Sequence, residues 1–409
     1  MKNIFYRMIC ICFGSIFLSF SFCFVYCENV QAEEKEENSY IVTAKNDLAL
    51  KELKKEYTTS VEQLLCDDVE EDKLLVISAT EEEAMQLQED TRVEAIEEDI
   101  VVYGCGENTV TTSSIEWNLD IINVKNSESV QNGEKIKVAM LDSGVDDCED
   151  IDVRERVNFI PGQDEVFALY EDSTGHGTCI AGILAGKDNE IGITGINPNM
   201  ELYSARVLDY HNSSKVSRII DAINWAIEKK VNILSLSFGT KTDSEVLHNA
   251  IKRAQENNIL IVAAGNDSQI EYPAAYPEVI AVGSIGTDGT VSENSAIGEE
   301  LELVAPGEQL LSTGAFDGVM TCSGTSMAVP HVVGVASLLW EKDSTADAEL
   351  IRMVLDAGAK TYDNKEVYGY GLVDYEYASN IYDQCKQFKL CRRITGRWNF
   401  GRKYKYSLC

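Results

Sequence analysis

Ser326 is the residue of this sequence best placed to act as a nucleophile. It lies in the small-residue run Ser-Gly-Thr-Ser-Met-Ala, shortly before an apolar segment, Val332 to Trp340, that predicts a helix. Backbone N–H groups at the start of a helix carry partial positive charge, which favours an oxyanion beside this serine. A serine hydroxyl is a weak nucleophile by itself, so the sequence must also supply a histidine base and a carboxylate that orients it.

The sequence contains four histidines, and His176 has the surroundings of a catalytic base. It lies in the run Thr-Gly-His-Gly-Thr, before an apolar helix predicted over 180–184, and its flanking glycines allow close approach of the backbone. His211 lies in a polar loop, His248 on a charged helix and His331 just after the serine motif. Because most single histidines are structural or surface residues, we interpret these three in that way.

Asp142 is the candidate carboxylate. It follows the apolar segment Lys135 to Leu141, which predicts a strand, and it precedes Ser143 and Gly144. An aspartate at the end of an apolar strand is well placed to be half buried, which suits a residue that orients a histidine. Taken alone, the same pattern is also typical of an aspartate that caps the next turn.

Three motifs together resemble the signatures of the subtilisin-like serine proteases. They are Asp-Ser-Gly at 142–144, His-Gly-Thr at 176–178 and Gly-Thr-Ser-Met-Ala at 324–328, and their order along the chain agrees with that family. The resemblance runs from about Trp117 to about Tyr382, roughly two thirds of the chain.

The resemblance implies a role for each candidate residue. Ser326 is the acylated nucleophile, His176 the general base and later acid, and Asp142 the orienting carboxylate. Asn266 follows a strand predicted over 259–264 and resembles the donor that holds the oxyanion together with the Ser326 N–H. Without the resemblance, an asparagine after a glycine is typical of a plain turn.

The resemblance also implies how a peptide substrate binds. The segment from residue 237 to residue 239 looks like the strand edge with which the family pairs an extended peptide through backbone hydrogen bonds. Binding through the backbone tolerates many peptide sequences. Phe238 in that segment and Ile219 either line an apolar pocket for the fourth residue before the cut or are ordinary core residues. The residues implied to bind substrate are Ser237, Phe238, Gly239, Ala264, Gly265, Asp267 and Glu271.

Asp267 and Glu271 resemble the rim and the floor of the pocket for the residue before the cut. Two carboxylates around one pocket favour Lys or Arg, because a buried charge without a partner is costly. The loop that carries them is shorter than in many members of the family, so the alternative is that Glu271 points to solvent. No Lys or Arg lies between Val93 and Val124, where self-cleavage is expected, and this counts against a basic preference.

The segment from residue 187 to residue 193 resembles the family's calcium loop, in which an asparagine side chain and backbone carbonyl groups supply oxygen ligands. The alternative is a plain turn made by Asp-Asn and Gly. The implied ligands of a structural calcium ion are Asp150, Lys187, Asn189, Ile191 and Ile193.

From Lys135 onward, apolar strands alternate with amphipathic helices. This order predicts an α/β fold with a mostly parallel sheet flanked by helices, as in subtilisins, and active-site loops at the carboxyl ends of the strands. The expected elements are strands at 201–208, 231–237, 259–264 and 279–285 and helices at 216–230, 244–257 and 346–357.

The first 32 residues predict export. Two early basic residues precede an apolar run from Met8 to Tyr26 and a small-residue end at Ala32, as in a signal peptide. The run is also long enough to remain as an uncleaved membrane anchor. Export permits disulfides, but Cys179 and Cys322 lie near the catalytic motifs, where thiols can also stay free, and the pairing cannot be read from the sequence.

Residues 33–110 are expected to form a small α+β, ferredoxin-like domain. Its order of elements resembles the propeptide of secreted subtilisins, which implies an intramolecular inhibitor with its carboxyl end in the active site; the alternative is a small module without that role. With 22 acidic and 7 basic residues, residues 33–104 contribute much of the net charge of −33, which argues against nucleic acid as a partner. The expected elements are strands at 40–45, 73–79 and 93–102 and helices at 47–57 and 81–90.

Residues 383–409 differ in composition from the rest of the chain. From Cys385 to Cys409 there are eight basic residues, five aromatic residues, three cysteines and no acidic residue. This tail either anchors the protein to an anionic cell surface, folds back on the acidic body, or forms an internal staple.

Together these features predict a secreted serine endopeptidase, a monomer made as a zymogen. Its parts are a signal peptide (1–32), a propeptide (33–110), a catalytic domain (111–382) and the basic tail (383–409). Polypeptides are the expected substrates: either one exported precursor whose leader is removed, or many proteins that are degraded. The competing class is a binding module with the same fold and no catalysis, and a fluorophosphonate separates the two because only an activated serine reacts.

Overall fold

The structure is a computed structural model of the 409-residue chain. It describes residues 37–57, 61–65, 73–104, 107–109, 117–124, 134–162, 172, 174–189, 192–266, 269–314 and 318–388, with only the backbone given for 61–65, 107–109 and 387–388. The expected signal segment and the tail beyond residue 388 lie outside the described residues. Within the described ranges, no helix has the length and apolar character needed to cross a bilayer.

Residues 38–98 form a small α+β unit. Its elements are β1 (Asn38–Ala44), α1 (Asp47–Glu56), β2 (Val61–Leu65), β3 (Leu74–Ala79), α2 (Glu81–Gln88) and β4 (Val93–Glu98). The strands form an antiparallel sheet in the order β2-β3-β1-β4. Val42 and Ile77 on the sheet form a buried cluster with Leu53 of α1 and Leu87 of α2, so both helices cover the same face.

The elements expected in this unit are confirmed with two differences. β2 is an additional strand, and the single strand expected over 93–102 is divided into β4 and β5 (Val101–Gly104). The chain leaves the sheet at Asp99, whose carboxylate binds Ser217, more than a hundred residues away in the sequence. Because the cause of the break is this tertiary contact, the local apolar pattern does not reveal it.

A parallel sheet of seven strands is the centre of the remaining chain, as predicted, with every strand pair parallel. Its strands, in spatial order, are β15 (Leu301–Pro306), β14 (Val279–Ile285), β13 (Leu260–Ala264), β11 (Ile233–Leu236), β7 (Lys137–Asp142), β9 (Glu201–Arg206) and β8 (Val153–Asn158). The expected strands and helices agree with these elements to within a few residues at each end.

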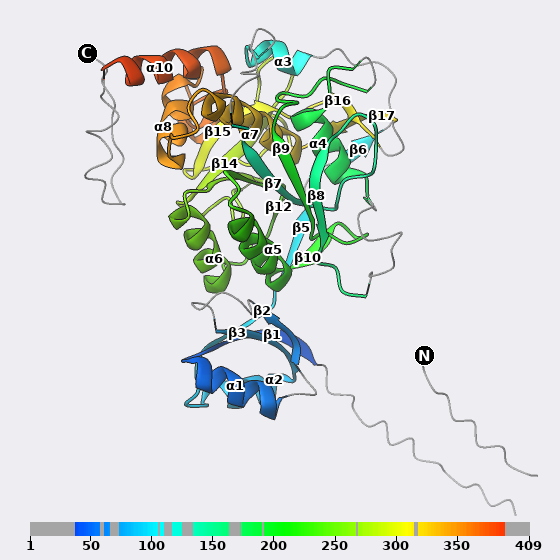
Figure 1. The fold of residues 1–409 in the computed structure, drawn as a ribbon, viewed down its shortest axis with the longest axis vertical. Coiled ribbons are helices and arrows are strands. Elements are labelled where there is room, and N and C mark those ends of the chain that lie inside the picture. Colours follow the sequence, from blue (N-terminus) through cyan, green and yellow to red (C-terminus); the bar gives the residue numbers. More distant parts are fainter. Residues whose placement is uncertain are drawn as a thin grey trace, which may run out of the picture. The chain divides into compact units, whose positions relative to one another are not determined.

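Helices cover both faces of this sheet (Figure 1). Val138 and Met140 of β7 point to a core shared with α4, α7 and α8, whereas the alternate residues Ala139 and Leu141 point to a core shared with α5 and α6. This burial on both faces explains why the central strands β11, β13 and β14 consist almost entirely of apolar or small residues. The helices are α4 (His176–Ala185), α5 (Val216–Lys229), α6 (Glu245–Glu256), α7 (Thr325–Glu341) and α8 (Ala348–Gly358).

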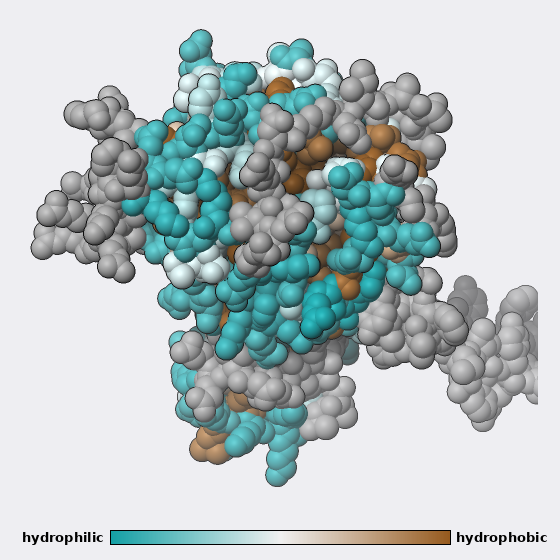
Figure 2. All heavy atoms as spheres, turned by 45° about the horizontal axis from the view of Figure 1, so that its top comes forward, coloured by the Kyte–Doolittle hydropathy of each residue, from teal (hydrophilic) through white to brown (hydrophobic). Residues whose placement is uncertain are grey.

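Two small three-stranded sheets complete the fold near the ends of the central strands. One has the order β10-β5-β12 and the other the order β16-β17-β6. The surface seen in Figure 2 is largely hydrophilic, in keeping with the acidic composition. The remaining elements are α3 (Trp117–Ile121), β6 (Glu107–Thr109), β10 (Ser213–Lys215), β12 (Phe238–Gly239), β16 (Leu310–Thr313), β17 (Val319–Ser323), α9 (Lys365–Tyr368) and α10 (Tyr375–Phe388).

Candidate active site

Asp142 and His176 form a buried pair at the carboxyl end of the sheet. Asp142 is the last residue of β7 and His176 is the first residue of α4. His176 Nδ1 lies 2.7 Å from Asp142 Oδ1, and neither side chain is more than 2% exposed. Because an ionised carboxylate only accepts, Nδ1 carries the proton in this pair and Nε2 is left as the basic nitrogen.

The loop after β7 and the start of α4 are locked together. A side chain at Gly177 would collide with the carbonyl oxygen of Gly144, so this position requires glycine. Asp172 accepts from the Ser143 hydroxyl at 2.6 Å and from the Thr178 N–H at 2.7 Å. Asp172 therefore accepts an N–H in the first turn of α4, two residues after His176. We did not assign it from the sequence, although an acidic residue shortly before a helix is a recognised start signal.

Ser326 lies in the first turn of α7 and not, as we predicted, in a turn before the helix. Its hydroxyl donates to the Ser237 carbonyl at 3.2 Å, and the Ser237 hydroxyl donates to the Ser326 carbonyl at 3.4 Å. That carbonyl lacks its usual helical donor, because the residue four positions later is Pro330, which has no N–H. Ser237 replaces the missing donor and holds the nucleophile against the end of β11.

The helices that carry His176 and Ser326 contact each other through the side chains of Cys179 and Met327. Cys179 Sγ and Met327 Sδ lie 3.6 Å apart, one turn after His176 and one residue after Ser326 respectively. Cys179 also forms a disulfide with Cys322, which is in β17. The sequence left this pairing open, and the structure joins the start of α4 to the strand that leads into the nucleophile.

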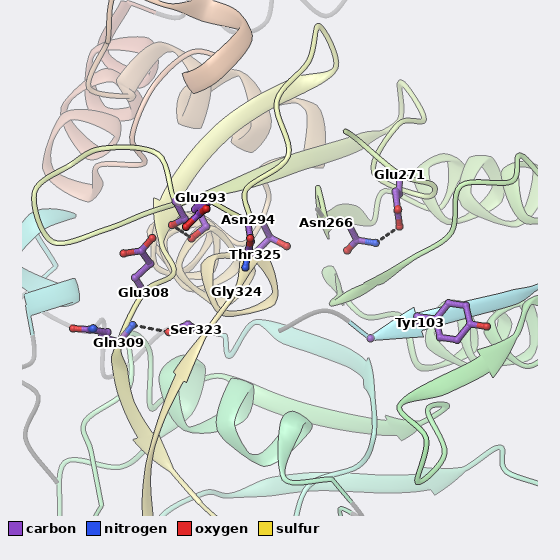
Figure 3. Close-up of a pocket in the computed structure, with 13 residues that line it drawn as sticks. Tyr103, Asn266, Glu271, Glu293, Asn294, Glu308, Gln309, Ser323, Gly324 and Thr325 are labelled. Atoms are coloured by element: carbon purple, nitrogen blue, oxygen red, sulfur yellow. Dashed lines mark hydrogen bonds between the residues drawn. The ribbon is translucent and has the colours of Figure 1, made fainter. Parts of the chain in front are cut away.

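Asn266 follows β13 and is buried, with a left-handed backbone φ of 68°. It lines a cavity of about 610 Å³ together with Gly324 and Thr325, the two residues before Ser326 (Figure 3). The Thr325 hydroxyl is buried and has no hydrogen-bond partner among the described residues. Thr325 is thus a further hydroxyl in the cavity that Asn266 lines, and sequence reasoning missed it, since its only signal is that it precedes Ser326.

An imidazole oriented by a buried carboxylate, a serine at a helix start and a buried amide are the components of a serine peptidase site. Residues 133–371 match the Subtilase family. The chain belongs to the subtilase family.

Its relatives are bacterial proteases. The thermostable alkaline protease of Halalkalibacterium halodurans is 30% identical over 354 residues, which cover 85% of this chain and 94% of that protein. Subtilisin NAT of Bacillus subtilis subsp. natto is 32% identical over 308 residues, 73% of this chain and 78% of that protein. The minor extracellular protease Epr of Bacillus subtilis is 31% identical over 74% of this chain, which spans only 49% of Epr.

This subtilase is a subtilisin-like serine endopeptidase. The roles that the resemblance implies for its residues stay predictions. Ser326 Oγ would attack the peptide carbonyl carbon while His176 Nε2 takes the hydroxyl proton and Asp142 stabilises the imidazolium. Asn266 Nδ2 and the Ser326 N–H would hold the oxyanion. The departing amine would take the proton from His176, and a water activated in the same way would hydrolyse the acyl-enzyme.

The segment predicted to bind peptide is a short strand, β12, beside Ser237. Phe238 is fully buried in the same cluster as Ile219 and Val102, so its side chain faces the core beneath β5. Ala264 ends β13, and the Gly265 N–H donates to the Val282 carbonyl at 2.9 Å, which fixes the turn before Asn266.

Of the two acidic residues predicted to line the pocket, the structure describes Glu271 but not Asp267. Asp267 lies outside the described residues. Glu271 is partly buried, and its Oε2 accepts a hydrogen bond from Asn266 Nδ2 (Figure 3). The carboxylate therefore faces the oxyanion donor, an arrangement that neither interpretation of the sequence anticipated.

Proposed function

We propose that this subtilase is exported and made as an inhibited precursor that cuts itself between Gly104 and Glu107. The observation that carries the proposal is the position of β5 between two strands of the catalytic domain. Gly104 pairs with Phe238 of β12 on one side, and Val102 pairs with Ser214 of β10 on the other. An extended peptide substrate pairs with a protein edge in the same way.

A second strand, β6, supports the same cleavage region, because it pairs with the strand that leads into Ser326. Glu107 of β6 pairs with Ser323 of β17, three residues before Ser326. Gly104 pairs with Phe238, next to Ser237, whose carbonyl accepts from the Ser326 hydroxyl, and Gly104 precedes Glu107 by three residues. Residues 105 and 106 lie outside the described residues, and we propose that the maturation cut is one of the three bonds between Gly104 and Glu107.

Two acidic residues anchor the inhibitory unit to helix starts. The Asp99 carboxylate accepts from the N–H and the hydroxyl of Ser217, in the first turn of α5. Glu97 accepts from the hydroxyl of Ser244 at 2.5 Å, and Ser244 is the N-cap of α6. Negative charge at a helix start is favourable, so both contacts stabilise the docked state.

The experiment compares the full chain with its Ser326→Ala variant by mass spectrometry and amino-terminal sequencing. We expect the native chain to acquire an amino terminus at residue 105, 106 or 107 and the variant to keep residues 37–104 attached. Cutting of the variant at the same bond would show that another protease matures the chain. A native chain that is fully active before any cut would refute inhibition.

A preference for Lys or Arg before the cut is a second, finer part of the proposal. Its support is the Glu271 carboxylate, which lines two cavities that Tyr103 of β5 also lines. A panel of fluorogenic peptides tests it: higher kcat/KM for aromatic residues than for Arg and Lys at that position would contradict the preference. Cutting of a single exported precursor would indicate a leader-removing peptidase, and cutting of many exported proteins would indicate a degradative one.

We also propose a structural calcium ion at Asp150. This side chain is fully buried, and its Oδ1 has no hydrogen-bond partner among the described residues. Its Oδ2 accepts from the Thr313 hydroxyl at 2.5 Å. Carbonyl groups of Lys187 and Ile193 and the Asn189 side chain would complete the oxygen ligands.

The remaining implied ligand, Ile191, lies outside the described residues. Among the residues that the structure describes, no group of three His, Cys, Asp or Glu side chains could hold a metal ion. The proposed site therefore depends on carbonyl oxygens. An unchanged melting temperature of the mature enzyme in EDTA would refute it.

Export and surface association complete the proposal. Export is supported by the signal-like segment and by the relative Epr, which is named an extracellular protease. The basic tail would hold a monomeric enzyme at an anionic cell surface. Deleting residues 389–409 tests this: an enzyme that still fractionates with cells would rule out anchoring by the tail.

A further inference from the structure

Asn266 and Glu271 are joined directly at the oxyanion position. Asn266 Nδ2 donates to Glu271 Oε2 at 2.5 Å, and Figure 3 shows the two side chains pointing toward each other. The turn between them is closed by the Glu271 N–H, which donates to the Gly265 carbonyl at 3.2 Å. The carboxylate therefore contacts the catalytic amide itself.

The chemistry of an amide makes this contact important. A primary amide has two N–H donors on nitrogen and an acceptor oxygen, and rotation by 180° exchanges the two ends. Only the nitrogen end stabilises an oxyanion, because the oxygen end would repel it. A carboxylate can only accept a hydrogen bond. Glu271 therefore binds Asn266 in the orientation in which the amide nitrogen, and not the amide oxygen, faces the carboxylate.

The surrounding backbone holds the pair in place. Tyr272, next to Glu271, exchanges two 2.9 Å backbone hydrogen bonds with Thr240, just after β12. A side chain at Gly239 would collide with Asn266 Nδ2 and approach Glu271 Oε2 to 3.1 Å. The pair is thus packed against the strand that binds the peptide.

We propose that Glu271 is a positioning residue for the oxyanion donor. It takes one N–H of the Asn266 amide and so fixes the plane in which the other N–H meets the oxyanion. Its negative charge near the oxyanion opposes the reaction, so the benefit is one of orientation and not of charge. A neutral acceptor at residue 271 should then serve as well as the carboxylate.

The test is a double-mutant cycle with Glu271→Ala, Glu271→Gln, Asn266→Ala and the Asn266→Ala/Glu271→Ala pair. The substrate is a fluorogenic peptide with alanine before the cut, which is too short to reach a distant pocket wall. Active enzyme is counted by fluorophosphonate titration, and amino-terminal sequencing confirms that all variants have matured at the same residue. Normalising to titrated sites removes any misfolded fraction.

We expect Glu271→Ala to lower kcat by about 10-fold with KM unchanged, less than the roughly 100-fold or greater loss expected when the donor itself is removed. Glu271→Gln should restore kcat to at least the native value, because its side-chain oxygen still accepts. In the Asn266→Ala background, Glu271→Ala should change kcat by less than about 2-fold, since no amide remains to be oriented.

Two results would overturn the proposal. One is an equal loss of kcat from Glu271→Ala with and without Asn266, and the other is an unchanged kcat in Glu271→Ala on the alanine substrate. The proposal rests on hydrolysis at Ser326 and not on self-inhibition. If the precursor proposal is wrong, amino-terminal sequencing will show no cut between Gly104 and Glu107, whereas the kcat values of the double-mutant cycle will still follow the pattern given above.

Discussion

Asp99 accepts two hydrogen bonds from Ser217, one from its backbone N–H at 2.9 Å and one from its hydroxyl at 2.8 Å. Lys215, two residues earlier, donates its Nζ to the Asp99 carbonyl at 2.7 Å. One residue of the amino-terminal segment thus satisfies three donors at the start of α5. This contact fixes where β4 ends and where β5 enters the active site.

The first prediction concerns this contact. Asp99→Ala, made in a Ser326→Ala chain that cannot cut itself, should reduce the free energy of unfolding by about 1–3 kcal/mol, because the helix start loses its acceptor and the buried donors remain unpaired. Urea unfolding measures the change. The control is Asp147→Ala at a fully exposed site, with an expected change below about 0.5 kcal/mol. Equal changes for the two variants would show that Asp99 is not an anchor.

The second prediction is a pH dependence. Burial and, as the smaller cause, the neighbouring Asp99 carboxylate together raise the pKa of Asp221 in α5 to about 7. The folded chain therefore holds a proton that the unfolded chain has already lost, so stability should fall as pH rises from about 4 to about 7. Asp221→Asn in the Ser326→Ala chain should flatten this part of the profile, measured as melting temperature against pH. An unchanged slope would contradict the assignment.

The third prediction concerns the disulfide. Replacing Cys179 and Cys322 together with Ala should lower the free energy of unfolding by about 2–4 kcal/mol, because the bond closes a long loop in the unfolded chain. It should also lower kcat, since the bond links the His176 helix to the strand before Ser326. The control is Cys385→Ala in α10, a cysteine with no disulfide among the described residues. A double variant with native stability and kcat would show that the bond is dispensable.

Much of the site was predictable because its motifs are local. Asp142 ends an apolar strand, His176 is bracketed by glycines, and the structure brings them within 2.7 Å of each other. The boundary at Ser326 was wrong because Pro330 is typical of a position outside a helix, whereas Ser237 supplies the donor that allows Pro330 inside α7.

Asp172, which sequence reasoning missed, and the Cys179–Cys322 pairing, which it left open, depend on long-range contacts. Asp172 binds Ser143, 29 positions earlier, and Cys179 joins Cys322 across 143 positions. Nothing in the local pattern around these residues identifies their partners. Glu271 shows the opposite case, since its position was identified from the family resemblance but its hydrogen bond to the neighbouring Asn266 was not.

The most direct test of the central claim is to treat the matured enzyme with a fluorophosphonate and to locate the adduct by mass spectrometry. We predict one adduct, on Ser326. The rate of labelling should fall sharply in a His176→Ala chain cut to the same amino terminus by native enzyme that is then removed, because only a serine deprotonated by that imidazole attacks phosphorus quickly. An enzyme that remains unlabelled, or that reacts equally fast without His176, would contradict the account.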